Sequence, residues 1–104
     1  MRNYFCKYIP PRPDFMDTLT AEEAGLLMDQ RAWQSDLFSR NVIVACGPVL
    51  DPTGSYGMAI YSIPESHDIA AITVLDPMVQ AKIGHYEHFP LLELTACSGS
   101  HAAI

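Results

Sequence analysis

The chain carries the segment GPVLDPTGSYGMAIY at residues 47–61, and this segment decides its fold. Two turn signals, Gly-Pro and Asp-Pro-Thr-Gly, separate stretches of β-preferring residues. Pro52 presets φ for a turn, Asp51 bonds to the backbone two residues on, and Gly54 accepts a positive φ. The segment therefore predicts a β-hairpin with strands at residues 41–48 and 56–63.

The remaining elements follow from patterns on both sides of this hairpin. Residues 2–9 are rich in aromatic and β-preferring types and predict a first strand, which three nearby prolines end. Thr20 and Glu23 form a capping box, so a helix is expected over 21–39. A second helix is expected over 65–75, then a short turn to residue 82 and a strand over 84–92. This βαββαβ order predicts an α+β, ferredoxin-like fold with a four-stranded antiparallel sheet.

The hairpin also predicts a partner. Residues 42–46 are apolar on both faces of their strand, so both faces are expected to be covered and Cys46 to be buried. The ferredoxin-like order places both helices on one face of the sheet. A second copy of the chain is the simplest cover for the other face. We therefore expect a homodimer with two sheets face to face and a cavity between them.

Composition limits the classes of function. The 104 residues suit one domain, expected at 1–93 with a tail at 94–104. A net charge of −6, with scattered basic residues, argues against a nucleic acid partner. No apolar run approaches the ~20 residues of a membrane span and no signal peptide is visible, so a cytoplasmic location without a membrane partner is expected.

Neither a cofactor nor a metal is expected from the motifs. Three cysteines, Cys6, Cys46 and Cys97, lie far apart, which argues against a disulfide framework or a structural zinc site. The four histidines show no metal-ligand spacing. The sequence has no P-loop, dinucleotide fingerprint or nucleophile elbow.

Four pieces of sequence together resemble the YCII-related domain family, a branch of the dimeric α+β barrel proteins. They are residues 7–13 (KYIPPRP), the hairpin at 47–54 (GPVLDPTG), the helix end at 75–77 (LDP) and the strand at 85–87 (HYE). The resemblance covers residues 1 to about 92. It implies a small dimer with a histidine–aspartate pair at the mouth of the barrel cavity. It also implies kinship with dehydrochlorinases of chlorinated aromatics and, more distantly, with muconolactone isomerases.

The family aspartate matches Asp76, but the family histidine falls where this chain has Gln30. Glutamine cannot take a proton near neutral pH, so it can only form hydrogen bonds. Asp76 is interpreted either as a carboxylate at the cavity mouth, oriented by Gln30, or as the N-cap of the turn that starts at Pro77. Gln30 interrupts an apolar helical stripe and needs a partner, which can be Asp76, a ligand or a backbone carbonyl.

A second group of candidates lies on the first and fourth strands. Strand alternation places His85, Glu87 and Phe89 on one face, which Lys7 shares from the neighbouring strand. Lys7 is expected to pair with Glu87 beside His85, and His85 is the candidate that replaces the missing family histidine in acid–base work. The alternative is an ordinary cross-strand ion pair beside a histidine at the dimer interface.

The residues leave three functions open. A cofactor-independent lyase or isomerase, resembling a dehydrochlorinase or a muconolactone isomerase, would act on a small cyclic metabolite with Asp76, His85 and Glu87 as catalytic groups. A non-catalytic binding or accessory dimer would have lost the histidine–aspartate pair. A purely structural dimer would have a filled interior. The expected ligand-binding residues are Gln30, Lys7, Tyr8, Trp33 and Phe89, although the aromatic ones suit a core equally well.

Overall fold

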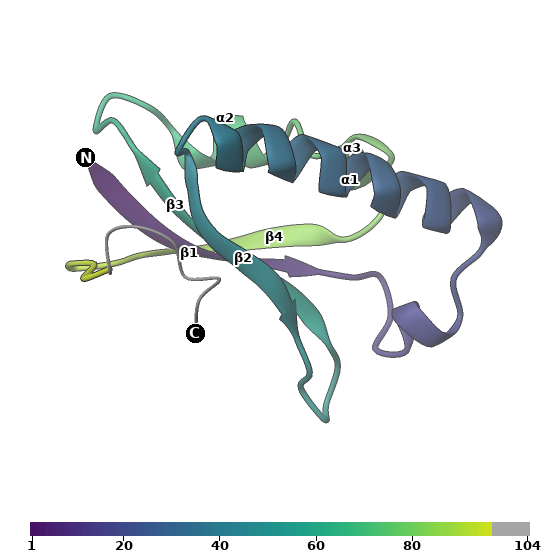
Figure 1. Ribbon diagram of the computed structural model, residues 1–104. Helices are drawn as coiled ribbons and strands as arrows, with labels where there is room; N and C mark the ends of the chain where they lie inside the picture. The colour runs from purple at the N-terminus through teal and green to yellow at the C-terminus, as the bar shows by residue number, and fades with distance from the viewer. Residues whose placement is uncertain (97–104) are drawn as a thin grey trace, which may run out of the picture.

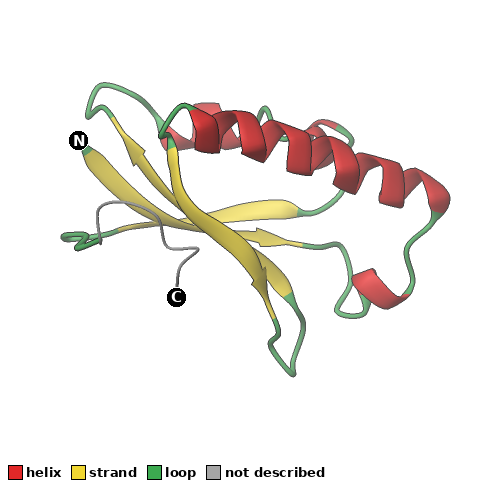
Figure 2. Cartoon of the chain, in the orientation of Figure 1, coloured by secondary structure: helices red, strands yellow, loops and turns green. Residues whose placement is uncertain are grey.

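A long helix and two short ones lie on one face of a four-stranded antiparallel sheet (Figures 1 and 2). The computed structural model describes residues 1–96. The elements are β1 (Arg2–Ile9), the 3-10 helix η1 (Phe15–Asp17), α1 (Ala21–Ser39), β2 (Ile43–Val49), β3 (Tyr56–Ile63), α2 (Ile69–Thr73), α3 (Pro77–Gln80) and β4 (His85–Pro90). The sheet order is β2-β3-β1-β4. The expected ferredoxin-like α+β fold is confirmed, as βαββααβ.

The hairpin and the long helix form where the sequence places them. The Asp51 carboxylate accepts from the Thr53 N–H at 2.9 Å, and Gly54 has a φ of +149°. The Thr20 hydroxyl accepts from the Glu23 N–H, and the Glu23 carboxylate accepts from the Thr20 N–H, so the capping box is complete. These local signals were enough to set the turn and the helix start.

The expectation of one helix over 65–75 is wrong. The N–H of His67 donates to the Pro64 carbonyl, which makes a turn, and the Asp68 carboxylate then caps the five-residue helix α2. Asp76 caps a separate helix, α3. Only residues 69–73 of the expected helix are therefore helical, and α3 lies in the stretch that was expected to be a turn.

The expectation that Cys46 is buried is wrong for the described residues. β2 is an edge strand, and Ala45 and Cys46 are exposed. The hairpin of β2 and β3 extends beyond the body of the sheet (Figure 1).

The hydrophobic core fills one end of the space between α1 and the sheet. The β3 residues that face the helices are small at the hairpin end of the strand and large at the other end. They are Gly57, Ala59, Tyr61 and Ile63, and the last three are buried. Leu37 packs from α1 onto this larger end. At the other end Leu26 and Leu27 of α1 pack against a smaller cluster of Tyr8, Phe15 and Met78. Gly57 offers no side chain there.

Residues 97–104 lie outside the described residues, and with them Cys97, His101 and most of the expected tail 94–104. Within residues 1–96, no helix is long and apolar enough to span a membrane.

Candidate functional site

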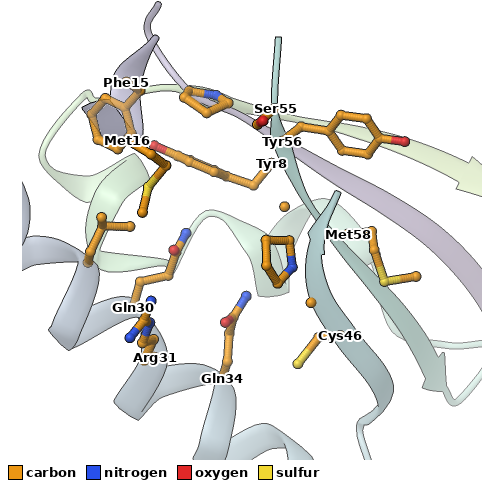
Figure 3. Close-up of a pocket in the computed structure, with 15 residues that line it drawn as sticks. Tyr8, Phe15, Met16, Gln30, Arg31, Gln34, Cys46, Ser55, Tyr56 and Met58 are labelled. Atoms are coloured by element: carbon orange, nitrogen blue, oxygen red, sulfur yellow. The ribbon is translucent and has the colours of Figure 1, made fainter. Parts of the chain in front are cut away.

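A cavity of about 360 Å³ opens between α1, η1 and the β2–β3 hairpin (Figure 3). It lies at the end of the sheet where Gly57 stands opposite Tyr8 on β1 and Pro48 on β2. Its wall consists of Tyr8, Pro10, Phe15, Met16, Leu27, Gln30, Arg31, Gln34, Cys46, Gly47, Pro48, Ser55, Tyr56, Gly57 and Met58. This wall is mostly apolar with a few polar groups, which is typical of a small-molecule site.

Four residues of one α1 face form the helical side of the cavity: Leu27, Gln30, Arg31 and Gln34. Their spacing of three and four residues places them on adjacent turns of the helix. In Figure 3, Phe15 and Met16 stand at one end of the cavity and Cys46 at the other, whereas Tyr56 and Met58 point away from it. The side chains of α1 and η1 thus face the β2–β3 hairpin across an open space.

An ion pair holds η1 in place as the end wall of this cavity. The Arg12 guanidinium donates to both Glu23 carboxylate oxygens, at 2.9 and 2.7 Å, and to the Thr18 carbonyl at 2.7 Å. It also lies 5.0 Å from the ring centroid of Phe15. These hydrogen bonds from Arg12, with one from the Thr20 N–H, lower the pKa of Glu23 to about 2. Arg12 therefore ties the segment before α1 to the first turn of the helix.

The Asp76 carboxylate lies behind the cavity wall and is fully buried. One oxygen accepts from the Met78 N–H at 2.7 Å, which makes Asp76 the N-cap of α3. The other oxygen accepts from Nε2 of Gln30 at 2.8 Å and from the Tyr86 hydroxyl. Both interpretations of Asp76 from the sequence therefore hold in part: it caps a helix and it contacts Gln30. It does not itself line the cavity.

Two tyrosines complete this buried cluster. The Tyr8 hydroxyl donates to the Ile83 carbonyl at 2.6 Å, and the Tyr8 ring packs edge-on against Tyr86 with centroids 5.5 Å apart. Burial raises the pKa of both phenols, and the nearby Asp76 carboxylate raises each further. Both hydroxyls are neutral donors at physiological pH, and Tyr8 presents its ring to the cavity.

The structure brings only some of the expected site residues together. Gln30 and Tyr8 line the cavity and Asp76 lies directly behind Gln30. Trp33 packs against the core cluster and lies outside the cavity wall. Phe89 lies on the sheet face opposite the helices, where its ring is 6.2 Å from that of Phe5.

His85 and Glu87 lie on the sheet face away from Asp76, and both are exposed. Adjacent residues of a strand point to opposite faces, and Tyr86 takes the helix side. Lys7 and Glu87 are cross-strand neighbours as expected, but the ion pair between them is not among those formed by residues 1–96. Lys7 Nζ instead lies 4.3 Å from the centroid of the Tyr56 ring, which offers a cation–π contact.

His88 and the possible metal ligands complete the description of the site residues. The helix-facing His88 hydrogen-bonds to the Thr73 hydroxyl at 2.8 Å, as expected of a core histidine. Within residues 1–96, no group of three or more histidine, cysteine, aspartate and glutamate side chains is arranged to hold a metal ion.

The sequence interpretation missed Tyr86, Arg31 and Gln34. Strand alternation already placed Tyr86 on the helix side, next to Tyr8, and this signal pointed to the buried cluster. The spacing of Gln30 and Gln34 on one helix face was likewise visible. No local sequence pattern predicted the cavity, because it depends on the sizes of side chains from α1, η1 and the β2–β3 hairpin.

Comparisons with known proteins agree with this architecture at the level of the fold. The sequence matches no family model. It also matches no curated protein. Among solved structures, the chain is similar to 5-chloro-2-hydroxyhydroquinone dehydrochlorinase from Burkholderia phenoliruptrix, solved in complex with 2,5-dihydroxybenzoquinone. The TM-score is 0.57 at 16% identity, over 81% of this chain and 90% of that chain. At this identity the similarity establishes the α+β fold alone.

Proposed function

We propose that this protein binds a compact ring-containing metabolite in the cavity between α1 and the sheet. The observation that carries the proposal is the cavity itself, about 360 Å³ with an apolar wall and a polar row on α1. A volume of this order suits a single substituted ring. The similar dehydrochlorinase, which holds a small quinone in its complex, supports a ligand of this size.

Binding without conversion fits the buried cluster best. A proton acceptor must reach the substrate directly or through one water. Asp76 is withdrawn behind the wall with both oxygens engaged, and the Tyr8 hydroxyl already donates to a carbonyl. Gln30, which stands between Asp76 and the cavity, cannot carry a proton.

A matched pair of variants tests this proposal. Gly57 faces the helices, so Gly57→Val places a side chain at the floor of the cavity. Gly25 is exposed on α1 and lies outside the cavity wall, and a Cβ there meets no atom within 4 Å, so Gly25→Val is the matched control. The ligand probes are 2,5-dihydroxybenzoquinone and a set of hydroxylated benzoates, observed by ligand-detected NMR. We expect binding to the wild type and to Gly25→Val, and none to Gly57→Val. Binding that survives Gly57→Val, or no binding to the wild type, overturns the proposal.

The second candidate is a cofactor-independent lyase or isomerase of the YCII-related type, acting on the same ring compound. The contact between Gln30 and Asp76 favours it, because a histidine in place of Gln30 would complete the acid–base pair that this family resemblance implies. His85 and Glu87 remain candidate catalytic groups on the far face of the sheet. Turnover that is lost in both Asp76→Asn and His85→Ala, with folding intact, supports this function. Unchanged turnover in both variants excludes this function. The absence of turnover in both the wild type and Gln30→His also excludes it.

The same proposal includes a homodimer formed through the open sheet face. Cross-strand pairing places Phe5 directly beside Ile60 on one side and Phe89 on the other. Phe89 is 46% exposed, so this row of three large apolar residues ends in an open aromatic ring. A second sheet packed face to face on this row would bury it, with the helices and cavities on the outside.

A further inference from the structure

Among residues 1–96, one charged side chain contributes to the cavity wall. Arg31 occupies the α1 face between Gln30 and Gln34, and the other fourteen wall residues are uncharged. It is exposed, and water therefore screens it in the free protein. A cation at the rim of an apolar cavity is a recognition element only if nothing in the protein already neutralises it.

Arg31 has no acidic neighbour on its own helix. The positions three and four residues away on either side are Leu27, Met28, Gln34 and Ser35, so no i,i+3 or i,i+4 pair can form. The ion pairs formed within residues 1–96 use other arginines: Arg12 pairs with Glu23 and Arg40 pairs with Asp36.

This pattern runs against the composition of the chain. The chain has twelve acidic residues and six basic ones, so an arginine at an arbitrary position is expected to have a carboxylate nearby. At the same time the net charge of −6 repels anions at long range. An anion preference of this cavity would therefore have to come from a local contact, and Arg31 is the residue that provides it.

We infer that the ring bound in this cavity carries an anionic substituent, a carboxylate or an ionised enol, which pairs with Arg31. The inference rests on the proposed binding function and names its ligand class. The guanidinium presents a planar fork of donors that matches a carboxylate, and the Gln34 amide lies one turn further along the same face. The apolar wall from Tyr8 and Phe15 then contacts the ring.

The experiment compares two probes of nearly equal shape, 4-hydroxybenzoate and 4-hydroxybenzamide, by titration calorimetry at pH 7 and low salt. We expect the wild type to bind the benzoate about tenfold more tightly, as one charge-assisted hydrogen bond gives. Arg31→Gln should remove this preference without weakening the benzamide. Arg40→Gln, an arginine outside the cavity wall, is the matched control and should keep it. High salt should reduce the preference in the wild type.

The possible failures are distinguishable. Equal binding of both probes to the wild type, or a preference that survives Arg31→Gln, overturns the inference and leaves the cavity as a site for neutral rings. If Arg40→Gln also lost the preference for the benzoate, the preference would come from the overall charge of the protein, and the inference would be overturned. If neither probe binds, or if Gly57→Val binds both, the cavity is not the site, and the inference falls together with the proposed function.

Discussion

Nε2 of Gln30 donates a 2.8 Å hydrogen bond to the Asp76 carboxylate, and this bond joins two residues 46 positions apart in the sequence. It fixes the middle of α1 to the N-terminus of α3 beneath the cavity wall. Gln30 is 7% exposed and Asp76 is fully buried. A hydrogen bond to a charged group contributes about 1.5–3 kcal/mol. This contact therefore stabilises the fold, whether or not the site is catalytic.

Asp76→Asn should destabilise the protein by about 2–3 kcal/mol. The new amide keeps the shape of the side chain, but its NH₂ group meets donors in either orientation. It replaces either the oxygen that accepts from both Gln30 and Tyr86 or the oxygen that accepts from the Met78 N–H. Urea unfolding measures the change. The control is Asp36→Asn, which removes an exposed i,i+4 ion pair and should cost less than about 0.5 kcal/mol. Equal losses in the two variants would contradict the role assigned to the buried cluster.

Glu23 should make stability depend on pH in the acid range. Its pKa in the folded protein is lowered to about 2 from the ordinary value of 4.5, chiefly by hydrogen bonds from Arg12. A lowered folded pKa means that the stabilisation is present above pH 4.5 and is lost as pH falls toward 2. The midpoint of thermal unfolding should therefore fall in this window in the wild type.

The variant Glu23→Gln should be less stable than the wild type at pH 7 and should show a shallower decline below pH 4.5. Glu22→Gln removes the same charge one residue away, at an exposed position outside the described ion pairs, and should follow the wild-type profile. A Glu23→Gln profile parallel to that of the wild type would show that the Arg12 contact does not control acid stability.

The sequence predicted those features that depend on neighbouring residues. The capping box of Thr20 and Glu23 and the turn at Asp51 involve partners two or three positions apart, so their chemistry was readable directly. The Gln30 and Asp76 contact was anticipated as one alternative, because helical spacing placed an unpartnered amide in an apolar stripe.

Features that depend on tertiary packing were not predictable. Arg12 and Glu23 are eleven positions apart, with η1 between them, and no repeating pattern marks such a pair. The cavity depends on Gly57 standing beneath α1, and that position is set by the register of three strands. The strand faces were assigned correctly, yet whether His85 and Asp76 share a site depended on which sheet face the helices cover.

Gly84→Ala should be among the most damaging small substitutions in this chain. Gly84 has a φ of +76°, which residues with a side chain rarely adopt. A Cβ there would lie 2.5 Å from the Ile9 carbonyl oxygen and would also collide with the Tyr8 hydroxyl. We expect a loss of more than about 2 kcal/mol in urea unfolding.

The same substitution at Gly25 is the control for this prediction. Gly25 lies inside α1, and a Cβ there meets no atom within 4 Å. Alanine should therefore stabilise the helix by about 0.5–1 kcal/mol. If Gly84→Ala were as stable as Gly25→Ala, the close approach of residue 84 to Tyr8 would be refuted, and with it the placement of the Tyr8 hydroxyl.

Ile60→Glu should convert the proposed homodimer into a monomer. Ile60 lies beside Phe5 on the open sheet face, so a dimer formed there would bury two unpaired carboxylates in an apolar layer, at a cost of several kcal/mol. Sedimentation velocity measures the mass directly. Val74→Glu, at an exposed valine between α2 and α3, adds the same charge on the helix side and should leave the dimer intact. A wild-type monomer, or a dimer that persists in Ile60→Glu, would refute pairing through this face.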